Sequence, residues 1–199
     1  MIDAPLDRVR LLLSERVGKK IDHQGRRASA VLLLLYPKDG SYCVLFNKRT
    51  DIVEFNKGEI CFPGGSKDPE DADLRATALR ETDEEMGVRP EDVTLFGELD
   101  ETPVRSGFVI QPFVATIPYP YQFNVSSQEV AAVLEVPFSV LYDQATIREE
   151  ARVHPEGHLT RTVAYAYNSH LIYGATANIL TQFLDLIGES AGLKEALGA

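Results

Sequence analysis

Cysteine is scarce in this sequence, which contains only Cys43 and Cys61 among its 199 residues. One pair cannot brace a chain of this length as the several disulfides of small secreted scaffolds do. Both cysteines lie in segments whose patterns predict neighbouring strands, so a single disulfide stays open as an alternative. The interpretation that we favour is two buried free thiols in a reducing compartment.

Positively charged residues are also fewer than negatively charged ones. Lys and Arg number 20 against 30 Asp and Glu, which gives a formal net charge of -10 at pH 7. Because nonspecific binding to a nucleic acid backbone needs Lys and Arg to displace counterions, we expect no nucleic acid partner. A phosphorylated small molecule is not excluded, but a cation must then stand between its phosphates and an acidic site.

Long hydrophobic runs are missing. The densest one, residues 31–35, is far too short to span a bilayer. Residues 1–13 carry Asp3, Asp7, Arg8 and Arg10 and therefore lack the apolar region of a signal peptide. We expect no membrane partner and a cytoplasmic location. The composition, 44% hydrophobic and 25% charged, is ordinary for a globular protein, and 199 residues suit a single domain over 1–199.

The spacing of apolar residues predicts three helices and a series of strands. The expected helices are an N-terminal one over 1–18, a central one that starts at Asp68 or Asp73 and ends at Gly87, and a C-terminal one over 175–187. The expected strands cover 28–36, 42–47, 59–62, 93–99, 108–117, 130–136, 147–153 and 162–167. Pro63-Gly64-Gly65 is expected to break the strand before it. This order predicts an α/β sandwich built on a mixed sheet.

The central helix concentrates negative charge on one face. Glu81, Glu84 and Glu85 stand at positions i, i+3 and i+4, and Asp83 adds a fourth charge to the same turn. All four lie near the C-terminal end, where the helix dipole also disfavours anions. A bound cation would relieve this conflict, and hard carboxylate oxygens suit Mg²⁺ or Mn²⁺ and not zinc.

The glycines before this helix allow the backbone to approach a ligand closely. A carbonyl of Gly64 or Gly65 can also join the shell of a metal ion, which would place a pyrophosphate between this loop and the carboxylate face. The alternative for the carboxylates and glycines together is an exposed acidic helix beside an ordinary turn.

The string Arg80-Glu81-x-x-Glu84-Glu85-x-Gly87-Val88 resembles the core of the Nudix box, which would span 64–88 here. The resemblance implies a Nudix-type α/β/α sandwich with a mixed β-sheet and a loop-helix-loop catalytic motif. There are departures: Thr82 stands at a usually apolar position, and one extra residue precedes Arg80. Asp71 is the acid nearest to the place of an expected Glu.

The resemblance also implies roles in a hydrolase. Glu81 and Glu85 map to the regular metal ligands, Glu84 to a ligand of a further ion or a residue that handles water, and Arg80 to the group that orients the glutamates. The metal polarises the phosphorus and lowers the pKa of bound water, which a carboxylate then positions or deprotonates. Members often recruit one more acid outside the box. Glu129 is our candidate, and its unranked rivals are Glu98, Asp100 and Glu101.

Beyond the box, the chain from about 32 to 186 resembles the coenzyme A pyrophosphatase-like subgroup. The matching residues of its second motif are Leu45, Arg49, Gly58, Phe62, Pro63, Gly64 and Gly65, and further matches lie at 106–108, 135–137 and 173–177. Among them, the expected substrate-binding residues are Arg49, Gly58, Phe62, Gly64 and Gly65. The implied reaction cleaves coenzyme A to adenosine 3′,5′-bisphosphate and 4′-phosphopantetheine. Related enzymes are often dimers, so the resemblance carries a homodimer as an expectation.

Four departures from the second motif cluster in one segment, where Phe46, Asn47, Thr50 and Glu54 replace its usual residues. An Arg is expected in place of Glu54, and Arg binds two phosphate oxygens with its fork whereas Glu repels them. The alternatives therefore stay open: a pyrophosphatase for ADP-ribose or dinucleotides, or a Nudix-fold module that senses a nucleotide without cutting it.

Overall fold

The computed structural model describes residues 3–52, 56–153, 157 and 159–199. Glu54, the residue that stands in place of an expected Arg, lies outside the described residues. The helices are α1 (Ala4–Ser14), α2 (Leu74–Met86), α3 (Phe138–Tyr142), α4 (Gly174–Glu189) and α5 (Leu193–Ala196), with a 3-10 turn η1 at Pro90–Asp92. The strands are β1 (Arg27–Lys38), β2 (Ser41–Arg49), β3 (Ile60–Cys61), β4 (Gly64–Ser66), β5 (Thr94–Glu98), β6 (Thr102–Val104), β7 (Phe108–Thr116), β8 (Val130–Pro137), β9 (Ile147–Val153), β10 (Leu159–Tyr167) and β11 (His170–Ile172).

A mixed sheet forms the centre of the molecule. Its strands follow the order β3-β2-β1-β7-β5, while β4 pairs with β1, β6 with β7 and β8 with β2. The pairing of β1 with β7 is parallel, and β1 meets both β2 and β4 in antiparallel register. Asp39 and Gly40 join β1 to β2 with positive φ angles of 50° and 80°, as a tight hairpin turn requires.

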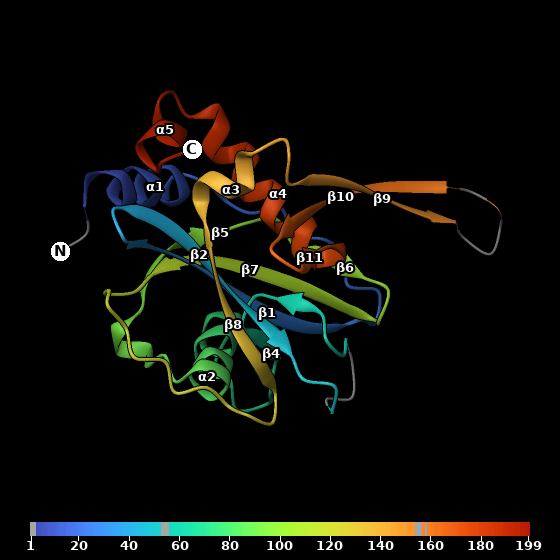
Figure 1. Cartoon of the computed structure of the whole chain (residues 1–199). Helices are drawn as coiled ribbons and strands as arrows, with labels where there is room; N and C mark the ends of the chain where they lie inside the picture. Colours follow the sequence, from blue (N-terminus) through green and yellow to red (C-terminus); the bar gives the residue numbers. More distant parts are fainter. Residues whose placement is uncertain (1–2, 53–55, 154–156, 158) are drawn as a thin grey trace.

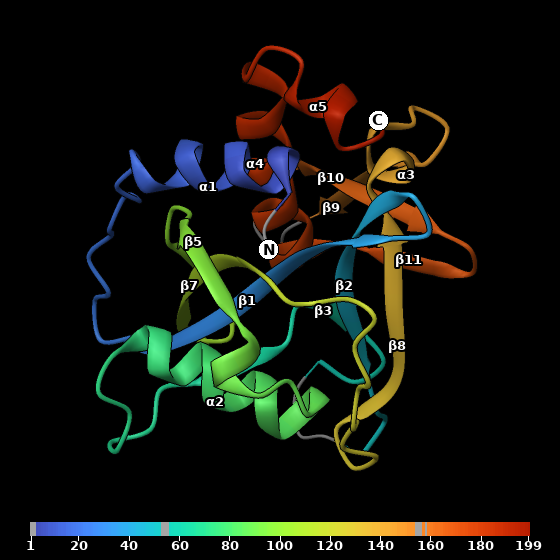
Figure 2. The same cartoon turned by 90° about the vertical axis from the view of Figure 1, so that its left-hand side faces the viewer.

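Helices cover both faces of this sheet (Figures 1 and 2). Successive residues of β1 point to opposite faces, so Leu33 and Leu35 join one apolar core while Leu32 and Leu34 join the other. The first core also contains the apolar residues of α1 and α4, and the second contains those of α2. The α/β/α sandwich with a mixed sheet is therefore confirmed.

A second, three-stranded sheet in the order β11-β10-β9 extends beside the sandwich, next to α4 (Figure 1). Its register pairs Tyr165 with both Ile147 and Ile172. Tyr165 and Ile172 are buried in the same core as α4, which anchors this sheet to the rest of the molecule.

The N-terminal helix is shorter than the expected span of 1–18, since α1 ends at Ser14 and Val17 is 86% exposed. After the helix the chain runs against the end of β5: Arg16 donates to the carbonyl oxygen of Glu98 at 3.1 Å, and a Cβ on Gly18 would lie 2.4 Å from the Leu99 carbonyl oxygen. These contacts need an extended connector, so Gly18 serves close packing and does not cap the helix.

Two further expectations need correction. Strand β3 ends at Cys61, before Pro63 as expected, but Gly64 and Gly65 then form a strand of their own, β4, and pair with Val31 and Ala30 of β1. Cys61 is half-buried and not fully buried, although both cysteines are free thiols and Cys43 is buried. Strands β2 and β3, which carry the two cysteines, are neighbours as expected. Among the described residues, no helix combines the length and the apolar character needed to cross a membrane.

Candidate active site

Helix α2 supplies the acidic face of the site. Of the two expected starts, Asp73 is the N-cap, and its side chain accepts a hydrogen bond of 2.9 Å from the backbone N–H of Ala76. Gly87 ends the helix in the left-handed conformation with φ 68°. The helix packs on β1 and β4, and the expected loop-helix-loop order is present with β4 formed inside the first loop.

The two glycines of β4 let the strand lie directly against the carboxylates of α2. A Cβ on Gly65 would stand 2.4 Å from the carboxyl carbon of Glu81, so a larger residue there would displace this carboxylate. Gly64 has φ 147°, and a Cβ there would stand 2.3 Å from the carbonyl oxygen of Ala30. The backbone N–H of Gly64 donates to Oε2 of Glu85 at 3.2 Å.

Glu85 is a buried carboxylate, only 1% exposed. Asn47 Nδ2 donates to its Oε2 at 2.8 Å, and Arg49 Nη1 lies 3.4 Å from its Oε1. Burial raises the pKa of Glu85 to about 7; the Gly64 N–H and Arg49 oppose this shift, whereas Glu129 and Glu81 add to it. Burial also raises the pKa of Glu81. A cation between these carboxylates would remove their mutual repulsion.

Arg80 binds several acids at once. Its Nε and Nη2 atoms each donate to the Asp71 carboxylate at 3.0 Å, Nη2 also donates to Glu81 at 3.1 Å and Nη1 donates to Glu84 at 3.0 Å. Asp71 is buried and also accepts hydrogen bonds of 2.9 Å from the hydroxyl of Thr77 and the N–H of Asp68. The Arg80 guanidinium holds the pKa of Asp71 well below its usual range. Arg80 thus orients glutamates, and Asp71 fixes Arg80.

The remaining acidic candidates fall into two groups. Glu84 is largely exposed beside Arg80, and Glu129, at the start of β8, is half-buried and close enough to raise the pKa of both Glu81 and Glu85. Glu98, Asp100 and Glu101 instead bind the connector after α1. Their partners there are Lys20 for Glu98, Arg16 and the N–H of Lys19 for Asp100, and the N–H of Ile21 for Glu101.

The expected substrate-binding residues lie in three kinds of place: beside the carboxylates, in a loop and in the core. Arg49, Gly64 and Gly65 adjoin the carboxylates, as described above. Gly58 lies in the loop before β3 with φ 69°, where the nearest atom to a Cβ would be Oδ1 of Asp51 at 3.4 Å. Phe62 is 2% exposed and stacks on Phe46 with ring centroids 4.7 Å apart, so it supports the wall of the site from within the core.

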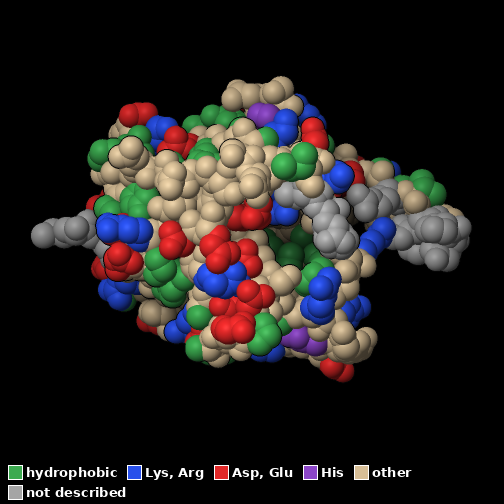
Figure 3. Space-filling view, turned by 90° about the horizontal axis from the view of Figure 1, so that it is seen from below, with side chains coloured by type: hydrophobic (Ala, Val, Ile, Leu, Met, Phe, Trp, Pro, Cys, Tyr) green, Lys and Arg blue, Asp and Glu red, His purple; other side chains and the backbone are tan. Residues whose placement is uncertain are grey.

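A cavity of about 490 Å³ opens beside these residues, and Figure 3 shows a hollow with a hydrophobic floor beside a gathering of acidic side chains. Its wall at this end is formed by Arg49, Cys61, Phe62, Gly64, Gly65 and Ser66. We call this end of the cavity the catalytic end. Most of the residues expected to bind substrate therefore line one cavity.

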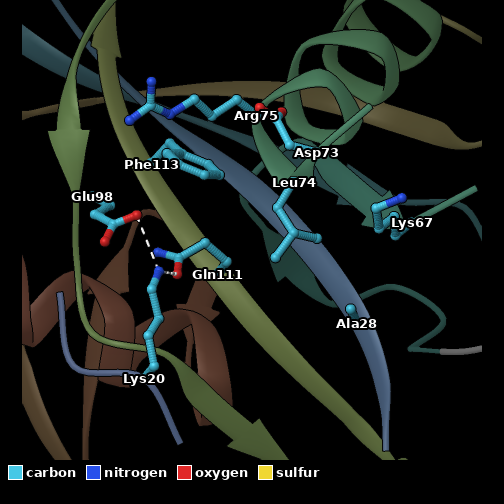
Figure 4. Close-up of a pocket in the computed structure, with 9 residues that line it drawn as sticks. All are labelled: Lys20, Ala28, Lys67, Asp73, Leu74, Arg75, Glu98, Gln111 and Phe113. Carbon is cyan, nitrogen blue, oxygen red and sulfur yellow. Dashed lines mark hydrogen bonds and ion pairs between the residues drawn. The ribbon is translucent and has the colours of Figure 1, made fainter. Parts of the chain in front are cut away.

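A separate cavity of about 430 Å³ lies at the start of α2 (Figure 4). Leu74 and Phe113 line it together with the cations Lys20, Lys67 and Arg75. Lys20 binds Glu98 and Gln111 there. Among the residues that the sequence offers for the site, Glu98, a rival to Glu129, lines this cavity.

Two important contacts were not predicted. The first is the ion pair of Asp71 with Arg80, for which the only signal in the sequence is the extra residue before Arg80. The second is the hydrogen bond of Asn47 to Glu85, at a position that departs from the subgroup pattern. Sequence spacing does not reveal that β2 brings Asn47 against α2.

The donor set fits a hard divalent cation in its chemistry. Glu81 and Glu85 present carboxylate oxygens next to the glycine backbone, and Glu129 adds a further negative charge near both. As the described side chains stand, no three from His, Cys, Asp and Glu are grouped closely enough to hold a metal ion. Arg80 Nη2 lies 3.1 Å from Glu81, and Asn47 and the Gly64 N–H lie against Glu85, so internal donors satisfy these oxygens.

Comparisons with known proteins agree on the class of protein. The sequence model of the NUDIX domain matches residues 26–152. The uncharacterized Nudix hydrolase NudL of Enterobacter sp. (strain 638) is 34% identical over 192 residues, which cover 94% of this chain and 95% of the relative. NudL of Cronobacter sakazakii is 32% identical and covers 89% and 91%. A crystal structure of a MutT/nudix family protein from Enterococcus faecalis covers all of this chain and 81% of its own, with a TM-score of 0.55 at 14% identity.

The fold and the acidic helix, together with these likenesses, define a Nudix pyrophosphohydrolase. This chain belongs to the Nudix hydrolase family and acts on nucleoside diphosphate derivatives. Nudix hydrolases generally use divalent metal cations.

Proposed function

We propose that this enzyme hydrolyses the pyrophosphate of coenzyme A or of a coenzyme A derivative, to adenosine 3′,5′-bisphosphate and 4′-phosphopantetheine. One observation carries the proposal: two residues of the second motif of the coenzyme A subgroup contact Glu85 of the Nudix box. Arg49 of that motif lies 3.4 Å from its Oε1, and the N–H of Gly64 donates to its Oε2 at 3.2 Å. This proximity supports a single site that combines the motif with the Nudix box.

In this proposal Mg²⁺ or Mn²⁺ is held by Glu81 and Glu85, with Glu84 and the Gly65 carbonyl as further ligands. When bound, the cation polarises the phosphorus and lowers the pKa of water. Arg80, fixed by Asp71, holds Glu81 and Glu84 in place. The same contacts support the proposed role of Arg80 in orienting these carboxylates.

Glu129 is the residue that we propose to position or deprotonate the attacking water. It lies outside the helix, and its charge acts on both Glu81 and Glu85. A carboxylate within hydrogen-bonding distance of the water accepts its proton as the oxygen attacks phosphorus. Arg49 lines the cavity beside this point, where a guanidinium binds phosphate oxygens.

A substrate panel tests the proposal. Wild-type enzyme is assayed with coenzyme A, dephospho-coenzyme A, ADP-ribose, NADH and diadenosine polyphosphates, each with Mg²⁺ and with Mn²⁺, and the Glu85→Gln variant shows the background. We expect the highest kcat/KM for coenzyme A or dephospho-coenzyme A. A higher value for ADP-ribose or a dinucleotide would overturn the choice of substrate and leave the class of reaction intact.

The replacement of an expected Arg by Glu54 favours one alternative, a substrate without the 3′-phosphate. If Glu54 faces that phosphate, Glu54→Arg raises kcat/KM for coenzyme A relative to dephospho-coenzyme A. An exchange of repulsion for a charge-assisted hydrogen bond is worth about 1–3 kcal/mol in a partly desolvated site. An unchanged ratio at fixed ionic strength would show that Glu54 does not read this phosphate.

A further inference from the structure

The catalytic cavity has a second end, formed far along the chain from the Nudix box. Its wall includes Val104 and Phe108 around the β6–β7 turn, Thr160 and Thr162 of β10, and Ala175 and Thr176 at the start of α4. We call these six residues and the space that they enclose the C-terminal lobe. The catalytic end and the C-terminal lobe are parts of the same cavity.

Most of this lobe lies outside the conserved domain. The NUDIX domain match ends at residue 152, whereas Thr160, Thr162, Ala175 and Thr176 follow it in the chain. The segment after 152 is nevertheless firmly attached to the catalytic end, because the hydroxyl of Tyr173 donates to Oε1 of Glu59 at 2.9 Å. The matched domain carries the carboxylates, and the segment after it completes the wall of the cavity.

The lobe offers hydrogen bonds and apolar surface. Thr160 and Thr162 stand two positions apart on β10 and so share one face of the strand. Thr162 is half-buried, and its hydroxyl has no hydrogen bond to another described residue. Helix α4 starts after Tyr173 without a side-chain cap, so the first backbone N–H groups beside Ala175 and Thr176 can donate to a carbonyl oxygen.

The lobe offers little net charge. The charged residues that line the whole cavity among those described are Arg49, Glu59, Arg105 and Glu150, whose formal charges cancel. A phosphate monoester would need an excess of cations or charge-assisted donors here. An uncharged chain with amide and methyl groups needs no such cations. Its amides match the hydroxyls and backbone N–H groups of the lobe, and its methyl groups match the apolar side chains of Val104 and Phe108.

We propose that the C-terminal lobe binds the uncharged, amide-bearing arm of the substrate and thereby selects it, an inference that rests on the proposed coenzyme A function. In coenzyme A this arm is the pantetheine chain. The pyrophosphate then lies at the catalytic end, and the nucleoside 3′-phosphate points out of the lobe. Thr162 is a specificity-determining residue in this arrangement.

Product inhibition tests the assignment, since each product carries one half of coenzyme A. Thr162→Val removes the hydroxyl at nearly constant volume, and Thr94→Val, on an exposed position of β5, is the matched control. We expect the inhibition constant of 4′-phosphopantetheine to rise about 3–10-fold in Thr162→Val. That of adenosine 3′,5′-bisphosphate should not change, and neither should change in Thr94→Val. A rise for adenosine 3′,5′-bisphosphate alone, an equal rise for both, or no rise overturns the proposal.

A second variant fills the lobe. Ala175→Leu should raise KM for coenzyme A at least about tenfold while kcat/KM for ADP-ribose, which lacks the arm, stays within about twofold. Thermal unfolding checks that the variant folds. Equal losses on both substrates overturn the proposal. If wild-type enzyme does not cleave coenzyme A, the proposed function fails by itself, and inhibition of its ADP-ribose activity by 4′-phosphopantetheine still tests the lobe.

Discussion

Asn47 donates a hydrogen bond of 2.8 Å from Nδ2 to Oε2 of Glu85, and both residues are almost completely buried. The Cys61 thiol donates to Oδ1 of the same Asn47 at 2.6 Å. Burial raises the pKa of Cys61 to about 12, so the thiol keeps its proton at neutral pH and remains a donor. The thiol therefore directs the amide oxygen of Asn47 away from Glu85 and its N–H group toward the carboxylate.

The first prediction concerns this contact. Asn47→Leu should lower kcat about tenfold or more, because a hydrogen bond to a charged group is worth about 1.5–3 kcal/mol and its loss lets the Glu85 carboxylate turn. Cys61→Ser is the control, since a hydroxyl still donates to Asn47 Oδ1, and its kcat should stay within about threefold. The assay compares kcat at saturating metal and substrate. Full activity of Asn47→Leu would show that Asn47 does not position Glu85.

The second prediction links Glu85 to stability. Burial in the folded state raises the pKa of Glu85 from its ordinary value of about 4.5 to about 7, so folding favours the protonated form. This contribution is fully present below about pH 4.5 and is lost as pH rises through about 7. Glu85→Gln imitates the protonated form and should therefore abolish most turnover yet raise the free energy of unfolding by about 1–3 kcal/mol at about pH 8.

Denaturant unfolding at about pH 5 and about pH 8, in excess chelator, measures this effect. The chelator matters because a bound cation lowers the pKa of its ligands. The advantage of Glu85→Gln should be larger at the higher pH. An advantage that is absent at both values, or larger at the lower one, contradicts the raised pKa of Glu85.

The sequence predicted the parts of the structure that depend on local pattern. The run of Val and Leu in β1 and the helical spacing of apolar residues in α2 predict these two elements. The i, i+4 spacing of Glu81 and Glu85 puts both carboxylates against β4. The hairpin at Asp39-Gly40 follows from its turn residues. Each of these features needs only a few consecutive residues.

Contacts between distant segments could not be predicted in this way. The sequence does not show that Asn47 meets Glu85 or that Thr162 shares a cavity with Gly64. The short strands β6 and β11 were missed because three residues carry too little pattern. The pairing of Gly64 and Gly65 with β1 was not predicted, because glycine has a low strand propensity.

The third prediction tests the anchor of Arg80. Asp71→Asn should lower the free energy of unfolding by about 1–3 kcal/mol near pH 7, because it breaks a buried ion pair of two 3.0 Å hydrogen bonds. Since the folded pKa of Asp71 lies well below its usual range, its contribution is present above about pH 4 and is lost at lower pH. The difference between wild type and variant should therefore narrow in acid.

Asp68→Asn is the matched control for the third prediction. Asp68 lies 3.7 Å from Arg80, and its side chain is 58% exposed, so water screens the pair. Its loss should change stability by a few tenths of a kcal/mol at about pH 7. Equal losses in the free energy of unfolding would mean that both variants disturb the loop, and that the Asp71–Arg80 ion pair is not the cause.

The last prediction separates Glu129 from its rivals in a divalent-cation assay. Wild-type turnover should stop in excess chelator and return with Mg²⁺ or Mn²⁺, because close carboxylates repel a pyrophosphate without a cation. Glu129→Gln should then lower kcat by about 10²–10⁴-fold at saturating metal, as expected when an acid–base group is removed. Glu98→Gln, whose residue instead binds Lys20, should stay within about twofold. If saturating metal restored full turnover to Glu129→Gln, this carboxylate would serve only to hold metal. A large loss in Glu98→Gln would make Glu98, which binds Lys20, the assisting acid.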